Sequence, residues 1–167
     1  MKRTAALVVA IAMALAFAAP AAATTTRTSY ACDAYLVEVT NEGTYWIDDG
    51  ALHMRGWSAI YDMVGDDMCA GTLFGGANFN LDLATSSGIV WGTGRIELEA
   101  VEGGFDSTLV AHFTADNPLL PDATDIWLAR YVRKGFGELA GWQARGTLLE
   151  RTHDHMVDTG YAFLPGD

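Results

Sequence analysis

Basic residues are scarce in this chain. Of its 167 residues only 10 are Lys or Arg, against 21 Asp and Glu, and the formal net charge at pH 7 is −11. Affinity for nucleic acid comes largely from Lys and Arg that displace counterions from phosphates, and adsorption to anionic lipid draws on the same charge. The composition therefore argues against nucleic-acid binding and leaves neutral or cationic partners open.

Long apolar runs are also missing, apart from one at the N-terminus. It follows Lys2 and Arg3 and covers residues 5–19, whereas a helix that spans a membrane needs about 20 apolar residues. Three alanines, Ala21–Ala23, then provide the small side chains that precede a cleavage site. This pattern predicts a cleaved signal peptide over residues 1–23, a secreted or periplasmic protein, and no membrane span after cleavage.

The remainder of the chain has the length of one domain. We expect a short leader over residues 24–29 and a single domain over residues 30–167, which is enough chain to bury a substantial core. No repeat, low-complexity linker or second domain is evident. The sequence leaves the oligomeric state open, as well as the choice between periplasm and medium.

Cysteine is nearly absent. Both cysteines, Cys32 and Cys69, lie in the part expected to be exported, where two thiols most simply form one disulfide. Closing that loop would stabilise the fold by about 4 kcal/mol in the chain-entropy model. The alternative is a redox or metal-binding pair, although the chain has no Cys-x-x-Cys motif.

Helical periodicity is not sustained anywhere after residue 24, whereas alternation of apolar and polar residues is common. Ile96 and Leu98, for example, alternate with Arg95 and Glu97, which predicts a half-buried strand with a charged outer face. Turn residues separate the strands, including Gly75-Gly76 and Lys134-Gly135. We predict strands over residues 30–40, 45–47, 51–63, 69–74, 78–84, 95–100, 108–113, 126–132, 139–151 and 155–163.

These short strands with hairpin-length connections predict an all-β fold. A single antiparallel β-barrel of about eight strands is the favoured architecture, because closure removes exposed sheet edges. A β-sandwich is the alternative. Several glycines within strands favour the barrel, since strongly curved sheets need residues without Cβ at kinks and bulges; they are Gly56, Gly92, Gly94, Gly141 and Gly146.

Three glycine-rich runs carry a resemblance to a known group of proteins. They cover Gly92–Glu99, Gly104–Thr108 and Gly135–Trp142, the last with a Gly-x-Gly-Glu-Leu-x-Gly turn. Residues 88–150 resemble small secreted bacterial β-barrel proteins of uncharacterised function, which resemble the allene oxide cyclase-like barrel of plant cyclases and dirigent proteins. The resemblance implies a closed antiparallel barrel of eight or so strands. No cyclase catalytic residue matches, so it implies no activity.

Aromatic side chains are the main candidates for contact with a ligand. Most should fill the barrel interior, and some could line an apolar pocket that opens at one end. The candidate ligand-binding residues are the aromatic Trp91, Phe113, Trp127 and Trp142, with Arg145 and Glu138 as polar groups.

Clusters of metal-ligating residues are weak. His153 and His155 would point the same way from a strand, and His112 could supply a third ligand, but two histidines do not make a site. The acidic residues near Asp66 lack the spacing of a calcium-binding loop. We therefore predict neither a metal nor a cofactor.

No catalytic motif is present, and no residue is predicted to be catalytic. The favoured interpretation is an exported, non-enzymatic β-barrel that binds a small apolar or aromatic ligand. One alternative is a structural or interaction protein of the cell envelope with a filled core. The other is a cofactor-free isomerase or cyclase, which would need a buried polar group such as Glu138, Arg145 or His112 facing the barrel interior.

Overall fold

The computed structural model describes residues 26–114, 128–152 and 154–165, which form nine strands and no helix. In this part of the chain there is accordingly no helix long and apolar enough to cross a membrane. The strands are β1 (Arg27–Asn41), β2 (Thr44–Asp48), β3 (Ala51–Gly65), β4 (Gly71–Asp82), β5 (Ser87–Leu98), β6 (Gly103–Thr114), β7 (Leu128–Gly137), β8 (Gln143–Thr152) and β9 (His155–Phe163).

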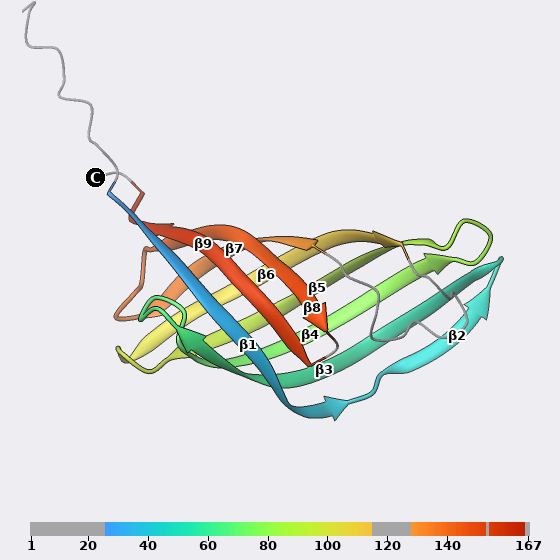
Figure 1. Ribbon diagram of the computed structural model, residues 1–167, viewed down its shortest axis with the longest axis horizontal. Coiled ribbons are helices and arrows are strands. Elements are labelled where there is room, and N and C mark those ends of the chain that lie inside the picture. Colours follow the sequence, from blue (N-terminus) through green and yellow to red (C-terminus); the bar gives the residue numbers. More distant parts are fainter. Residues whose placement is uncertain (1–25, 115–127, 153, 166–167) are drawn as a thin grey trace, which may run out of the picture.

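The strands close into an antiparallel barrel (Figure 1). The order of neighbours is β1-β9-β8-β7-β6-β5-β4-β3-β2, and an additional pairing of β1 with β3 closes a ring of eight strands. The remaining strand, β2, pairs with the first residues of β3 and extends the sheet beyond the ring. The predicted all-β barrel is confirmed.

Strand β1 is the closing element. Its first part, Arg27–Tyr35, pairs with β9, and the segment from Cys32 to Asn41 pairs with β3. The two registers overlap, so the residues from Cys32 to Tyr35 have a neighbour on both sides. Beyond Leu36 the pairing with β3 contains two irregularities. Such irregularities increase the local twist and let one strand bridge two others that diverge.

Alternation of side chains along the strands places the core inside the barrel. On β5, Ile96 and Leu98 are buried, whereas Arg95 and Glu97 are exposed, as the sequence predicts. The bend expected at Gly56 is present too. It has a φ of +75°, which favours glycine, and the pairing of β3 with β4 is irregular between Met54 and Trp57.

Two predicted turns are wrong. Gly75-Gly76 lies in the middle of a continuous β4, where Gly75 pairs with Gly94 and Gly76 with Thr93. Gly75 faces the interior, and a Cβ there would lie 3.8 Å from the Tyr61 ring. Gly75 thus leaves space inside a crowded barrel, a role that also selects a residue without a side chain.

The predicted turn at Lys134-Gly135 lies inside β7, which continues to Gly137. A Cβ on Gly135 would lie 2.0 Å from the carbonyl oxygen of Leu139, so this glycine permits close approach of the backbone that follows the strand. The chain reverses at residues 138–142, where the N–H of Trp142 donates to the carbonyl of Leu139. Residues 139–142 therefore form the turn and not the start of the next strand.

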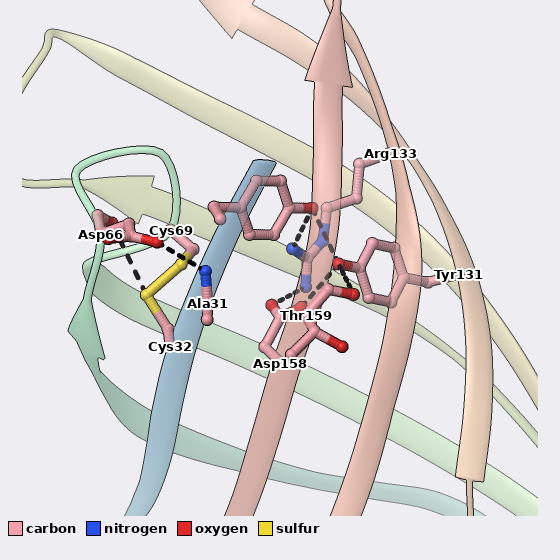
Figure 2. The surroundings of a disulfide bond; sticks show 9 residues. Ala31, Cys32, Asp66, Cys69, Tyr131, Arg133, Asp158 and Thr159 are labelled. Atoms are coloured by element: carbon pink, nitrogen blue, oxygen red, sulfur yellow. Dashed lines mark hydrogen bonds and ion pairs between the residues drawn. A yellow bond between two sulfur atoms is a disulfide. The ribbon is translucent and has the colours of Figure 1, made fainter. Parts of the chain in front are cut away.

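The predicted disulfide is present. Cys32 of β1 is bonded to Cys69 in the connection between β3 and β4, and both residues are buried (Figure 2). Asp66 holds the same connection against β1, because its carboxylate accepts a hydrogen bond from the N–H of Ala31 and its own N–H donates to the Ala31 carbonyl. A disulfide is consistent with an oxidising, extracytoplasmic compartment.

Candidate functional site

Four polar side chains meet inside the barrel, where apolar residues would be expected. They come from three strands: Tyr30 from β1, Tyr131 and Arg133 from β7, and Asp158 from β9. Figure 2 labels Tyr131, Arg133 and Asp158, which point toward one another. Arg133 and Asp158 are 2% and 0% exposed. Charged residues are almost never buried to this degree unless they are paired, so this cluster is the most unusual feature of the interior.

The four side chains form one hydrogen-bonded network. The Nη2 group of Arg133 donates to Oδ2 of Asp158 at 2.6 Å, and its Nη1 group donates to the Tyr30 hydroxyl at 3.2 Å. The Tyr131 hydroxyl donates to Oδ1 of Asp158 at 2.6 Å and lies 2.8 Å from the Tyr30 hydroxyl. Both oxygens of the carboxylate are therefore satisfied, one by a cation and one by a phenol.

Glycines opposite the tyrosines make room for this network. Tyr131 pairs with Gly146 on β8, and Tyr30 pairs with Gly160 on β9. A Cβ at Gly146 or at Gly160 would lie within 2.5 Å of the Tyr131 hydroxyl oxygen. Any larger residue at either position would displace the phenol, which explains why glycine occurs at two inward positions of neighbouring strands.

The electrostatics of the cluster favour an ion pair flanked by neutral phenols. Burial of Arg133 alone would lower the pKa of its guanidinium, but the Asp158 carboxylate and the adjacent tyrosines raise it. Burial raises the pKa of Tyr30 and of Tyr131, even though the positive charge of Arg133 acts in the opposite direction. The guanidinium also stacks on the Tyr131 ring, with its carbon 3.8 Å from the ring centre.

One donor of the cluster remains without a partner. Within the part of the chain that the structure describes, Nε of Arg133 is the buried side-chain nitrogen or oxygen that has no hydrogen-bond acceptor. A buried donor without an acceptor costs about 1–3 kcal/mol and more when the group is charged, so such atoms are rare in folded proteins.

Arg133 borders an interior cavity of about 50 Å³. The inward-facing Gly75 of β4 and Gly94 of β5 leave this space open, and Ser107 contributes a hydroxyl to its wall. The other large side chains around it are mainly apolar: Trp57, Tyr61, Leu73, Leu109, Tyr131, Leu148 and Met156. The cavity thus combines apolar walls with one cationic side chain whose Nε is unpartnered.

Raising the pH above 10 is expected to unfold the barrel. Burial raises the pKa of Tyr30, Tyr61 and Tyr131 above the ordinary value of 10.0, and carboxylates nearby add to the effect. Because these pKa values are raised in the folded state, the stabilisation is complete below pH 10 and is lost as the pH rises, since the unfolded chain releases its protons first. Tyrosinate absorbance and circular dichroism should therefore change in one common transition for these three rings. Ionisation of all tyrosines near pH 10 in a chain with native circular dichroism would contradict this.

The predicted ligand-binding residues are not brought together. Trp91 lies on the outer face of β5, where the Arg55 guanidinium packs 4.6 Å from its ring centre. Phe113 packs against the core at the end of β6, edge-on to Phe79. Trp142 packs against the core at the turn before β8.

The polar members of the predicted set face outward. Glu138 and Arg145 are exposed, and so is His112, the third polar group considered for an isomerase or cyclase. Trp127 lies outside the described residues.

The histidines near the start of β9 do not form a metal cluster in the described residues. Nε2 of His155 lies 2.7 Å from Oδ1 of Asp33, and its ring stacks on Tyr35. His153 lies outside the described residues. Where the structure describes the chain, no group of three or more His, Cys, Asp or Glu is placed to hold a metal ion.

Sequence reasoning missed the four residues of the polar cluster. The predicted strand over residues 126–132 ended one residue before Arg133. The two-residue spacing that places Ala129 and Tyr131 on one face was therefore not extended to Arg133. Extending the strand would have placed Arg133 on the same inward face as those two residues. On β9, Asp158 lies on the same inward face as Met156 and Ala162. An ionisable residue in an inward register was therefore the available signal.

A second hollow lies on the outer face of the barrel. It has a volume of about 640 Å³ and crosses β3 to β7, above inward-facing glycines and the outward-facing Gly76. The side chains of Ile60, Phe74 and Val132 supply its apolar surface. Arg95 and Asp106, which also line it, form an ion pair with Nη1 and Oδ1 3.5 Å apart.

Comparisons with known proteins return no match: no family model, no curated protein and no solved structure is significantly similar to the chain. The resemblance of residues 88–150 to the allene oxide cyclase-like barrel stays a prediction.

Proposed function

We propose that this protein is an exported, non-enzymatic barrel that binds a small ligand in its interior. One observation carries the proposal: the cavity beside Arg133 is lined mainly by apolar side chains, and Nε of that arginine has no acceptor. Pockets that bind small molecules combine apolar walls with a few placed polar groups, and a ligand that supplied an acceptor would remove the cost of the unpartnered donor.

The volume of the cavity limits the size of the ligand. Sites for drug-sized molecules measure about 300–1,000 Å³, and a single water needs about 10–15 Å³ measured with a probe of water size. A cavity of about 50 Å³ therefore suits a molecule of a few non-hydrogen atoms. The apolar walls favour a partly apolar molecule over a cluster of waters, since buried water needs two to four polar partners.

Export is part of the proposal. It is supported by the signal-like residues 1–23 and by a buried disulfide, which persists only in an oxidising compartment in most organisms. The isomerase or cyclase alternative is not proposed, because Glu138, Arg145 and His112 are all exposed and the interior Arg133 is held in an ion pair with Asp158.

The alternative of an interaction protein has one observation in its favour. Large apolar side chains are exposed on the outer face of β6 and β7, at Val110, Leu128 and Val132. Val132 borders the outer hollow, and Val110 and Val132 border the shallow surface beside it. A barrel that used this face for a partner would need no occupant in its interior.

Native mass spectrometry of the protein purified from producing cells tests the proposal, with two glycine variants as a matched pair. We expect a chain that begins after residue 23 and carries a small additional mass that is lost on denaturation. A Cβ at Gly75 would point into the barrel and meet nothing nearer than 3.8 Å, so Gly75→Ala should fold while its methyl group occupies part of the cavity. Overpacking a filled site costs about 1–3 kcal/mol, so the affinity for the ligand should fall at least about fivefold and the occupancy should fall with it.

Gly76→Ala is the control. Gly76 faces outward beside Thr93, and a Cβ there would meet nothing nearer than 3.6 Å. Neither glycine has a positive φ, so both variants should be stabilised by a similar amount, about 0.4–1 kcal/mol, through the unfolded chain. Equal occupancy in the two variants, or a bare chain in the unmodified protein, would overturn an interior ligand and favour the interaction protein.

A further inference from the structure

We infer that the interior site selects an uncharged ligand that carries a hydrogen-bond acceptor, such as a carbonyl, ether or hydroxyl oxygen, and that the Nε–H group of Arg133 donates to it. The inference rests on the proposed function and names the chemistry of its ligand. It follows from the charge balance of the polar cluster together with the identity of its one unpartnered atom.

The charge of the cluster is already balanced. The guanidinium of Arg133 and the carboxylate of Asp158 form a direct ion pair, with Nη2 and Oδ2 2.6 Å apart. The tyrosines add no charge, because burial raises the pKa of each phenol. An anionic ligand would therefore bring an uncompensated charge into a site whose walls are mainly apolar, and burying such a charge is costly.

Within the described residues, the buried polar atom that lacks any partner is a donor. Both Asp158 oxygens already accept hydrogen bonds, from Tyr131 and from Arg133. The Tyr30 hydroxyl is engaged by the Nη1 group of Arg133 and by the Tyr131 hydroxyl. Nε of Arg133 is the atom left over, and an arginine nitrogen can donate but cannot accept. A cationic ligand would likewise bring an uncompensated charge into the site, and it could not accept the hydrogen bond that Nε–H offers.

The walls of the cavity define the rest of the ligand. Leu73, Leu109 and Leu148 offer only apolar surface, and Met156 offers a polarisable thioether that adapts to irregular shapes. A short alkyl or similarly apolar group bonded to one acceptor atom matches this combination. The hydroxyl of Ser107, on β6, is a further polar contact of the cavity. It is neutral, so it does not alter the charge that the site requires of its ligand.

Nuclear magnetic resonance of the ¹⁵N-labelled protein tests the inference through the side-chain Nε–H signal of Arg133. That proton is buried and lies near the Tyr131 ring, so its signal should exchange slowly with solvent and be displaced by the ring. Three probes are titrated into the millimolar range. Acetone is neutral and accepts a hydrogen bond, acetate has a similar size and carries a charge, and xenon is apolar.

We expect acetone to move the Nε–H signal downfield in a saturable manner and acetate to bind at least about tenfold more weakly. Xenon should perturb the methyl signals of the cavity walls and leave Nε–H in place. Acetate binding as tightly as acetone would overturn the inference and leave an interior ligand standing, and so would a response to xenon alone. A response to none of the three probes, with a water in contact with the Nε proton, would overturn the inference and the proposed function together.

Discussion

Replacing Asp158 with Asn is expected to destabilise the barrel by about 3–5 kcal/mol, because it leaves the buried guanidinium of Arg133 without a counter-charge. The substitution keeps the shape of the side chain and an oxygen that can accept from Tyr131, so the lost charge is the main change. The free energy of unfolding in urea gives the measurement. Asp106→Asn is the control: Asp106 forms an exposed ion pair with Arg95, and such pairs contribute at most about 1 kcal/mol.

A second substitution separates a charge effect from a packing effect. Arg133→Met combined with Asp158→Asn removes both charges and keeps most of the side-chain volume, and breaking a buried pair is costly mainly because one charge is left uncompensated. We expect the double variant to regain most of the lost stability. A double variant as unstable as Asp158→Asn alone would show that the unpaired charge is not the cause.

The same double variant bears on binding. If it folds and the cavity still loses its response to acetone, then Arg133 supplies an interaction with the ligand that the fold does not need. The buried ion pair would in that event be retained for recognition, since a fully apolar interior would serve stability at least as well.

The barrel could be predicted because alternation is a local signal. On β5, the alternation of Ile96 with Arg95 and Glu97 follows from one face lying against the core and the other in water. On β9, the predicted range of residues 155–163 matches the observed strand. Closure of the barrel by β1 could not be predicted from alternation. It depends on how β1 is aligned with both β3 and β9, and the sequence of one strand does not specify its alignment with distant strands.

Glycine caused the errors in strand boundaries. Gly75-Gly76 and Gly135 were interpreted as turns, but all three lie inside strands, where the missing side chain leaves space in the interior at Gly75 and lets the backbone at Leu139 approach Gly135 closely. Local sequence does not distinguish these two uses, since both require only that the side chain be missing. The error at Gly135 also concealed the candidate site, because a strand that ends at residue 132 excludes Arg133 from the interior.

The disulfide is expected to have an effect of similar size to that of the buried ion pair. Cys32 and Cys69 are 37 residues apart, and a loop of that length corresponds to about 4 kcal/mol in the chain-entropy model. In a chain of this size that loss lowers the midpoint of thermal unfolding by roughly 10 °C. Thermal unfolding with and without a reductant measures it, and a variant with both cysteines replaced by alanine should not respond to the reductant.

The position of the disulfide predicts that its loss and the loss of the ion pair will not be additive. Cys32 lies at the seam of the barrel, where it pairs with Gly65 of β3 on one side and with Asp158 of β9 on the other. Residues that share a contact couple by about 0.5–3 kcal/mol, whereas distant residues do not. We expect reduction combined with Asp158→Asn to deviate from the sum of the two separate effects, while reduction combined with Asp106→Asn remains additive. Additivity in both combinations would mean that β1 holds its place without the disulfide, and that the seam and the polar cluster open independently.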